Sequence, residues 1–337
     1  MGSVPAMHPD RDEAWVSIRD SMSDAMAYDS NDSMVMSGDS LELLRRMPDD
    51  SVSLILTDPP YHSTRKSNIM NDTAFHEDGD FIAWMEKYAV EWRRVLRANG
   101  TLYMFCSSCM SARLEVMISR HFRPLSHIVW TKPNLPGFDG WRRKASKERL
   151  RAWYPHSERI LVFEHGEPGM THRSPFGEYL RETRKTCGLS MKELTEKIGE
   201  YGTVNHGGAV ANWETGRNIP SEDQYDRIRE ALIGTGGIAE MPSYQDVIRP
   251  MNLHDDMEYT DVWDFPSVRP HKGKHPAEKP IPMLEHIIHA SSYPDDIILD
   301  CFAGSGTTGI AARNLGRRSI LMELDPQWVT TITSRMT

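Results

Sequence analysis

Two short segments of the sequence carry side chains that could act together in a reaction. The first is Asp58-Pro59-Pro60-Tyr61, which directly follows the apolar run 51–57. The prolines end a strand because they lack a backbone donor, and they make the loop rigid. They do not explain why a carboxylate and a phenol ring stand side by side. On its own, the segment fits a strand-ending turn as well as it fits a reactive site.

The second segment is 301–309, CFAGSGTTG, in which Gly304, Gly306 and Gly309 form G-x-G-x-x-G. Glycines let a ligand approach the backbone, and the start of the following helix favours an anionic group such as a carboxylate. Glu323 ends the next predicted strand, where it can accept both hydroxyls of a ribose. By itself this pattern is a weak signal, and it fits NAD as well as S-adenosylmethionine.

The Asp-Pro-Pro-Tyr segment distinguishes these two cofactors. A hydride-transfer enzyme has no evident use for it, whereas an enzyme that methylates an amino group does. The exocyclic amine of a nucleobase is a poor nucleophile because its lone pair is conjugated into the ring. Asp58 and the carbonyl of Pro59 can each accept one N–H, which turns the lone pair toward a methyl donor. Tyr61 offers a face for a base that has left the duplex.

Strands and helices alternate around both segments. The apolar patterns predict strands at 33–39, 51–57, 101–107, 295–300 and 317–325, and helices at 41–47, 81–96, 112–122, 310–316 and 326–336. The helix 81–96 is expected to stop at a C-cap signal, 98–100. This alternation indicates an α/β fold with a Rossmann-like, doubly wound, largely parallel sheet. Ligands bind such a sheet at the carboxyl ends of its strands, where the strand order reverses, so the two segments are expected to face each other there.

The two ends of the chain are expected to lie near each other. After the strand that carries Glu323, a doubly wound sheet calls for one more strand with a cofactor contact, but the sequence continues only with a helix. The strand 33–39, which ends in Gly38-Asp39, can supply it from the N-terminal side.

Residues 176–233 show only helical periods, punctuated by glycines and a proline, and predict an all-helical module inserted in the α/β protein. The predicted organisation is a polar lead-in at 1–30, a catalytic half at 31–173, the module at 174–234, and a connection with a cofactor-binding half at 235–337.

The net charge of −9 argues against indiscriminate binding of nucleic acid, so any DNA contact must come from a local basic patch. Residues 141–151, WRRKASKERLR, form such a patch with six basic residues and one acid. Alone it reads as a solvated helix face; beside a base-modifying site, phosphate binding is the better interpretation. Cys106 and Cys109 have no second cysteine pair, so two packed thiols are expected and no metal site is predicted. No apolar run reaches the length of a membrane span.

Three motifs in this order resemble those of amino-methylating DNA methyltransferases of the permuted beta group, in which the catalytic half precedes the cofactor half. They are DPPY at 58–61, HPAEKP at 275–280 and DCFAGSGTT at 300–308. The resemblance covers roughly 33–165 and 260–337 and implies a circularly permuted methyltransferase sheet. It implies the catalytic residues Asp58, Pro59, Pro60 and Tyr61. Around S-adenosylmethionine it places Asp39, Lys279, Pro280, Asp300, Phe302, Gly304, Ser305, Gly306, Thr307, Thr308 and Glu323.

The inserted module resembles the helix-turn-helix of phage repressors, above all in NWETGRNIP, 212–220. In this group the region between the halves carries target recognition. Against DNA contact, 176–233 holds eight Lys/Arg and ten Asp/Glu, and glycines occupy the start of the presumed recognition helix. A packing or dimerisation module is therefore the alternative. The residues predicted to bind DNA are Arg142, Arg143, Lys144, Lys147, Arg149, Asn212 and Arg217.

The sequence thus predicts an adenine-N6 methyltransferase of double-stranded DNA, because Asp in the first motif position favours adenine, whereas cytosine-N4 enzymes more often carry Ser. The alternatives are cytosine-N4 methylation and a DNA-binding regulator with an inactive methyltransferase fold. The resemblance implies a cytoplasmic protein of a bacterium or phage. It leaves open a homodimer and a cognate restriction endonuclease.

Overall fold

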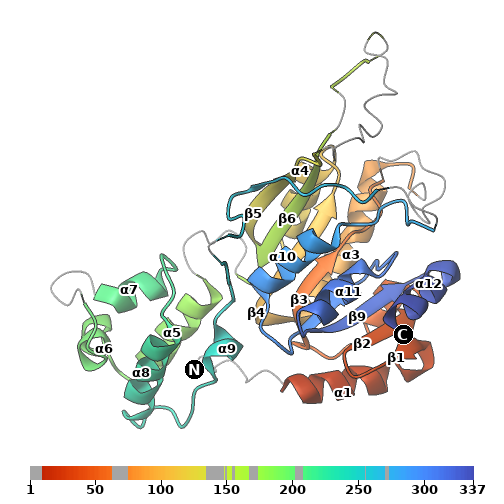
Figure 1. Cartoon of the computed structure of the whole chain (residues 1–337). Helices are drawn as coiled ribbons and strands as arrows, with labels where there is room; N and C mark the ends of the chain where they lie inside the picture. The colour runs from red at the N-terminus through yellow and green to blue at the C-terminus, as the bar shows by residue number, and fades with distance from the viewer. Residues whose placement is uncertain are drawn as a thin grey trace.

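The computed structural model describes residues 10–62, 75–133, 148, 150–153, 156–166, 174–201, 208–254, 256–269 and 273–337. Within them the strands form one sheet in the order β1-β2-β9-β8-β3-β4-β6-β5-β7 (Figure 1). The strands are β1 (Met26–Asp29), β2 (Ser33–Ser37), β3 (Val52–Thr57), β4 (Leu96–Cys106), β5 (Arg123–Trp130), β6 (Glu158–Glu164), β7 (Val262–Trp263), β8 (Ile297–Asp300) and β9 (Arg318–Glu323). The helices are α1 (Arg11–Ser21), α2 (Ser40–Leu44), α3 (Asp78–Val95), α4 (Ser111–Ile118), α5 (Pro175–Thr186), α6 (Met191–Lys197), α7 (Gly208–Glu214), α8 (Glu222–Ile233), α9 (Tyr244–Val247), α10 (Ile281–Ser291), α11 (Thr307–Asn314) and α12 (Pro326–Met336).

The centre of the sheet is parallel, as the sequence predicts. Strands β2, β9, β8, β3 and β4 pair in parallel, whereas β1 and β6 run antiparallel to their neighbours. The chain passes from β3 through α3 to β4 in one direction, and from β8 through α11 to β9 in the other. The order therefore reverses between β3 and β8, which pair directly through Leu54–Ile298 and Ile55–Leu299. This is the reversal at which α/β sheets bind ligands.

The strand from the N-terminal side completes the C-terminal half, as predicted. Strand β2 pairs in parallel with β9 from Ser33–Ser319 to Ser37–Glu323. The two ends of the described chain also touch, since the Tyr28 hydroxyl donates to the carbonyl of Met336 at 2.8 Å.

Two features differ from the sequence prediction. The polar lead-in, expected to be irregular or helical, contains helix α1, which buries Trp15 and Ile18 in the main core, but it also contains β1, an antiparallel edge strand. Helix α3 ends at Val95 and passes directly into β4, so 98–100 is not a C-cap. Gly100 is required for packing instead, since a Cβ there would lie 2.8 Å from the carbonyl oxygen of Ser53.

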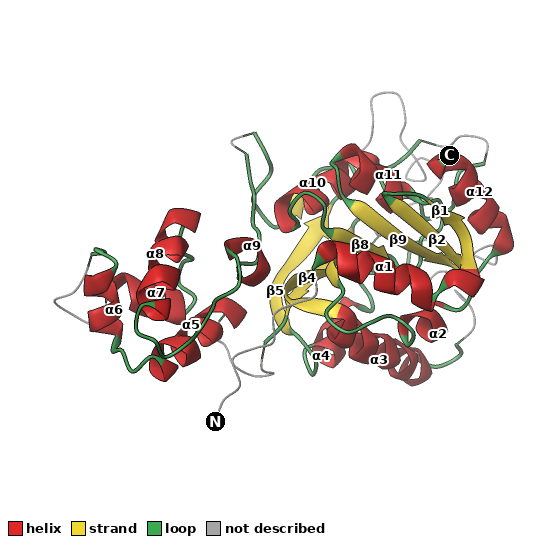
Figure 2. Cartoon of the chain, turned by 90° about the horizontal axis from the view of Figure 1, so that it is seen from below, coloured by secondary structure: helices red, strands yellow, loops and turns green. Residues whose placement is uncertain are grey.

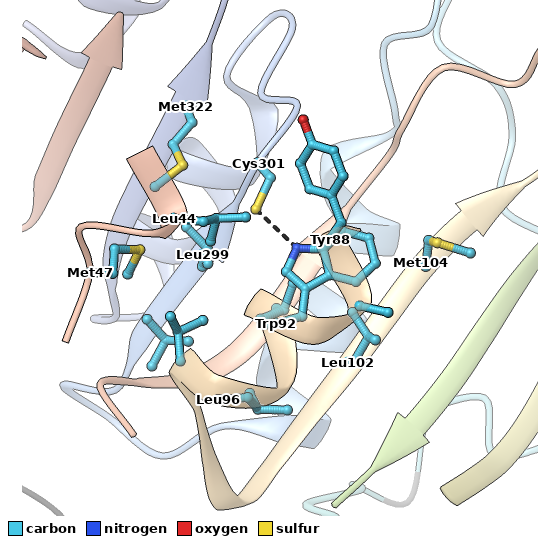
Figure 3. Close-up of a cluster of buried hydrophobic side chains, with 14 of the residues drawn as sticks. Leu44, Met47, Tyr88, Trp92, Leu96, Leu102, Met104, Leu299, Cys301 and Met322 are labelled. Carbon is cyan, nitrogen blue, oxygen red and sulfur yellow. Dashed lines mark hydrogen bonds between the residues drawn. The ribbon is translucent and has the colours of Figure 1, made fainter. Parts of the chain in front are cut away.

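Helices cover both faces of the sheet, with α3 and α4 on one face and α10 and α11 on the other (Figure 2). Successive strand residues alternate between the two faces, as the two-residue period of a strand requires: Ile55 joins the core under α3, and Leu54 and Leu56 join the core under α10. In the first core, the Trp92 indole N–H donates to Cys301 Sγ at 3.3 Å and so fixes α3 to the end of β8 (Figure 3).

The prediction that Cys106 and Cys109 are two packed thiols is wrong for Cys109. Cys106 is buried at the end of β4, but Cys109 lies in the following turn and is exposed. None of the helices in the described ranges is long and apolar enough to cross a membrane.

Helices α5 to α8, which the sequence analysis assigned to the inserted module, gather beside the sheet (Figure 1). They have their own core, which includes Leu180, Leu194, Trp213 and Ile228. The segment that follows the module in the sequence is bound to the first part of β4. There the Asn99 side-chain amide donates to the carbonyls of Gln245 and Ile248 at 2.9 and 3.3 Å. The module therefore adjoins the amino end of β4, opposite the edge where the parallel strands end.

Glu214→Ala should unfold the module selectively. Glu214 forms a buried bidentate pair with Arg184 at 2.5 and 3.0 Å, which joins α7 to α5. Removal of one partner leaves a buried charge uncompensated and costs about 3–5 kcal/mol. Hydrogen exchange should show lost protection in α5 and α7 and unchanged protection in β3 and β8. The exposed Glu182, paired with Lys185 on the surface of α5, provides the control Glu182→Ala. Equal protection in both variants would contradict the assignment.

Candidate active site

Four acids lie at one edge of the sheet. The parallel strands β2, β9, β8 and β3 are consecutive, and their carboxyl ends lead into or carry Asp39, Glu323, Asp300 and Asp58 in that order. Neighbouring strands are about 4.8 Å apart, so the ends of β9 and β3 are separated by roughly 10 Å. The Asp-Pro-Pro-Tyr segment and the glycine loop 301–309 follow the adjacent strands β3 and β8, which confirms that they face each other.

The glycine loop needs its glycines for conformation and for close packing. Gly304 and Gly306 adopt left-handed φ angles of 51° and 76°. At Gly309 a Cβ would lie 2.6 Å from Leu321 Cδ1, so only glycine lets α11 sit this close to β9. Ser305, Thr307 and the rest of the turn are consequently buried at the start of α11.

Asp300 holds the glycine loop to its neighbours. Its Oδ1 accepts from the Thr57 hydroxyl and from the Phe302 amide, both at 3.1 Å, and its Oδ2 accepts from the Thr308 hydroxyl at 2.6 Å. Burial raises the pKa of Asp300 to about 6. The carboxylate thus links β3, the loop and α11.

Glu323 ties the other side of the loop to β9. Its Oε2 accepts from the Gly304 amide and its Oε1 from the Asp325 amide, each at 2.8 Å. Burial raises the pKa of Glu323. The Gly38 amide donates to the Glu323 carbonyl at 3.0 Å, which brings the end of β2 alongside. Asp39 follows there and caps α2 by accepting from the Leu41 amide at 2.9 Å.

These groups suit a nucleoside-type cofactor that carries a carboxylate. Each carboxylate oxygen can accept more than one hydrogen bond, so Glu323 retains acceptor capacity for ribose hydroxyls while it holds the loop. Phe302, packed 5.1 Å from the Tyr88 ring centroid, supplies an apolar wall. The half-buried ring of His275 lies against Gly304, where an added Cβ would approach it to 3.0 Å. Burial lowers the pKa of His275 to about 4, so this ring is neutral.

One carboxylate oxygen of Asp58 is hydrogen-bonded, and the other has no partner among the described residues. The ammonium of Lys279 donates to Asp58 Oδ2 at 2.5 Å. Asp58 Oδ1 is buried, and among the described residues it has no hydrogen-bond partner. Burial raises the pKa of Asp58, and nearby Glu158 adds to the rise while Lys279 opposes it. An unpaired buried carboxylate oxygen is costly, which favours a ligand donor at this position.

Lys279 lies against the catalytic loop, although the resemblance places it at the cofactor. Its Nζ is 3.2 Å from the Tyr61 hydroxyl and 3.5 Å from a Glu158 oxygen, besides its bond to Asp58. Burial opposes the charge of Lys279, but the two carboxylates outweigh burial and raise its pKa. Pro280, the next residue, is the N-cap of α10, so Lys279 lies just before the helix begins.

Sequence reasoning missed Glu158 and Lys132. Glu158, the first residue of β6, accepts from the Tyr61 hydroxyl at 2.8 Å and pairs with Lys132 after β5. Although burial would raise it, the pKa of Glu158 falls to about 2 because Lys279 and Lys132 stabilise the carboxylate. The sequence offers only a charge at the start of an apolar run; its importance depends on β6 lying beside β4, which no local pattern reveals.

Of the residues predicted to bind DNA, Asn212 and Arg217 are described by the structure. Arg142, Arg143, Lys144, Lys147 and Arg149 lie outside the described residues. In the sequence they lie between Lys132 and Glu158, the described residues that form an ion pair at the catalytic edge. Asn212 is half-buried on α7, and Arg217 is exposed beyond it. Both belong to the module, which adjoins the opposite edge of the sheet.

Comparisons with known proteins agree with this geometry. The family model N6_N4_Mtase, described as DNA methylase, matches residues 52–334. The chain is 27% identical over 298 residues to the DNA adenine methyltransferase YhdJ of Escherichia coli K12, covering 88% of this chain and 79% of that protein. It is 22% identical over 318 residues to the Type II methyltransferase M.ScaI of Streptomyces caespitosus, covering 92% and 83%. The fold is similar to that of the cytosine-N4-specific PvuII DNA methyltransferase, with a TM-score of 0.55, 19% identity, and coverage of 93% and 89%.

Asp300→Asn should change how stability depends on pH. The pKa of Asp300 rises from its ordinary 3.8 to about 6 in the folded protein, so the folded state holds this proton more tightly than the unfolded chain does. The stabilisation from this group is complete below about pH 4 and is lost as pH rises through 6. Wild-type stability relative to the variant should fall by up to roughly 3 kcal/mol between pH 4 and 8, measured by urea unfolding. A difference that does not change with pH would contradict a proton held at Asp300.

Proposed function

The chain belongs to the N6/N4 family of S-adenosylmethionine-dependent DNA methyltransferases, and from this premise we propose that it methylates the N6 amino group of adenine in double-stranded DNA. The observation that carries the proposal is the buried Asp58 Oδ1, which has no hydrogen-bond partner among the described residues and lies beside Pro59 at the strand-order reversal, next to the glycine loop. Two features favour adenine: the acid at the first position of the motif, and the likeness to a relative named as a DNA adenine methyltransferase.

In this proposal the catalytic loop activates the amine by orienting it. Asp58 Oδ1 and the carbonyl of Pro59 each accept one N–H, so that the nitrogen lone pair points away from the loop. The prolines and the bond from Lys279 keep the carboxylate in place before the base arrives. Tyr61, whose hydroxyl is anchored to Glu158, presents its ring to the flipped base.

The cofactor, when bound, supplies an activated methyl group. Glu323 and Asp39 are proposed to hold its ribose and adenine, and the start of α11 its carboxylate. Asp300, Thr308 and Ser305 act on the cofactor indirectly, by shaping the loop. The order of the two halves and the pairing of β2 with β9 support assignment to the permuted beta group.

The nucleoside product tests the proposed target. The protein would be incubated with DNA and S-adenosylmethionine carrying a labelled methyl, and the DNA digested to nucleosides. The proposal requires label in N6-methyldeoxyadenosine. Label in N4-methyldeoxycytidine would move the assignment to cytosine, and no labelled nucleoside on DNA of varied sequence would favour a DNA-binding regulator. The likeness to a Type II methyltransferase favours a cognate endonuclease, which should fail to cut DNA that this protein has methylated.

Asp58→Ala should nearly abolish methylation while cofactor binding stays within about threefold of wild type. The carboxylate is proposed to act on the amine and not on the cofactor, and loss of a well-oriented group at the reacting atom costs about a hundredfold or more. Isothermal titration with the cofactor and single-turnover methylation measure the two effects.

Asp49→Ala provides the control for Asp58→Ala, because Asp49 is exposed and pairs only with Arg94 among the described residues. Wild-type activity in Asp58→Ala, or a loss of cofactor affinity as large as the loss of rate, would contradict the role of Asp58.

We further propose that the basic stretch 141–151 binds the DNA backbone at the target, and that the module, as a helix-turn-helix, contacts DNA farther along. Two observations support this proposal: Lys132 and Glu158, which flank the stretch in the sequence, lie at the catalytic edge, and the module adjoins the other edge.

The double variant Asn212→Ala, Arg217→Ala should bind DNA slightly more weakly. Its binding should also depend less on salt, by the amount that corresponds to about one phosphate contact. The sequence that it methylates should not change. Fluorescence anisotropy across a salt series measures the slope, and sequencing of methylated sites measures site choice. Loss of site choice would make the module the specificity element; an unchanged slope would remove these two side chains as DNA contacts.

A further inference from the structure

We propose that Glu158, backed by Lys132, is a positioning residue of the reaction: it holds Lys279 away from Asp58 Oδ1 and so keeps that oxygen free for the target amine. The inference rests on the proposed function. None of the motifs at 58–61, 275–280 or 300–308 includes either residue.

The contacts around Lys279 carry the argument. Its three N–H groups face Asp58 Oδ2 at 2.5 Å, the Tyr61 hydroxyl at 3.2 Å and the Ala277 carbonyl at 3.3 Å. A Glu158 oxygen lies 3.5 Å away on the side of Tyr61. The ammonium is thus shared between two carboxylates and binds only one oxygen of Asp58.

Without the charge of Glu158, Lys279 would be drawn to the Tyr61 side by neutral groups such as the Tyr61 hydroxyl and no longer by a carboxylate. An isolated ammonium–carboxylate pair in a buried site gains by approaching both oxygens, because the attraction is strong at low dielectric. Lys279 would then compete with the target amine for Oδ1. Tyr61 would also lose its charged acceptor, and with it the fixed direction of the ring that faces the base.

Lys132 completes the network. It pairs with the other oxygen of Glu158 and lies 4.6 Å above the Trp130 ring, which holds it at the end of β5. The five groups Asp58, Tyr61, Lys132, Glu158 and Lys279 come from four separate parts of the chain. Their charges balance as two carboxylates and two ammonium groups, which is what a buried site requires.

A purely structural ion pair between Glu158 and Lys132 is the competing interpretation. It predicts that loss of Glu158 lowers stability and leaves the titration of the site as it is. The positioning role predicts a change in the pH dependence of the chemical step, because the charge of Glu158 raises the pKa of Asp58. The titratable groups that face Asp58 are Lys279, Tyr61 and Glu158, with Asp300 and Cys106 behind them.

The sign of the change follows from these charges. Asp58 must be ionised to accept the amine, so activity falls as pH drops through its pKa. Glu158→Gln keeps an oxygen for the Tyr61 hydroxyl but removes the negative charge, so the pKa of Asp58 and the acid limb of the rate profile should move down. Lys132→Met removes a positive charge from the same site, so the limb should move up.

The experiment measures single-turnover methylation of duplex DNA against pH for both variants, with cofactor affinity by isothermal titration. For Glu158→Gln we expect a rate about tenfold to a hundredfold lower on the plateau, an acid limb at lower pH, and cofactor affinity within about threefold of wild type. Glu164→Gln is the matched control: Glu164 ends the same strand, is buried and pairs with Arg123 and Arg249 at the opposite edge. It should lower the melting temperature and leave the limb in place.

The outcomes separate the inference from the proposed function. If wild type produces no methylated DNA, the proposed function fails. The positioning role is overturned if wild type is active and Glu158→Gln has the same rate and the same acid limb of the pH–rate profile. It is also overturned if the acid limb of Glu158→Gln moves no more than that of Glu164→Gln. If Glu158→Gln does not fold, Lys132→Met decides: its side chain is a quarter exposed, and an acid limb that fails to rise overturns the inference.

Discussion

The buried ion pair between Asp58 and Lys279 is the interaction on which the site depends. It joins two residues that are 221 positions apart in the sequence, and it lies at the point where the strand order reverses. A carboxylate in this position must be ionised to accept an amine, yet burial disfavours its charged form and raises the pKa of Asp58. The lysine opposes that rise, and it binds only one oxygen, so that the other has no hydrogen-bond partner among the described residues.

The sheet makes this pairing possible. Strands β3 and β8 come from opposite ends of the chain, and their direct contact places the catalytic loop beside the glycine loop. Asp300 and Glu323 then fix the glycine loop by accepting from its own amides and from Thr308, so the same acids that mark a cofactor site also stabilise its shape. The shape of the glycine loop therefore depends on both acids.

Sequence reasoning predicted the parts that local pattern determines. The five parallel strands β2, β3, β4, β8 and β9, the two loops and the reversal between them follow from apolar periodicity and from connection rules. Sequence reasoning took 98–100 for a C-cap, whereas β4 begins at Leu96 and Gly100 makes a close contact with β3. It missed Glu158 and the ion pair of Lys279 with Asp58, because both depend on β6 and α10 packing against the catalytic loop. A long-range charge network leaves no periodic trace in a sequence.

The most direct test of the account is a crystal structure of the protein with duplex DNA and a non-reactive analogue of S-adenosylmethionine. We expect the target base flipped out, its amino nitrogen within about 3.2 Å of Asp58 Oδ1 and of the Pro59 carbonyl, and Lys279 still bound to Asp58 Oδ2. A structure in which Lys279 moves to the cofactor, or in which the amine meets a different acceptor, would contradict the central claim that the lysine leaves one oxygen of Asp58 open for the substrate.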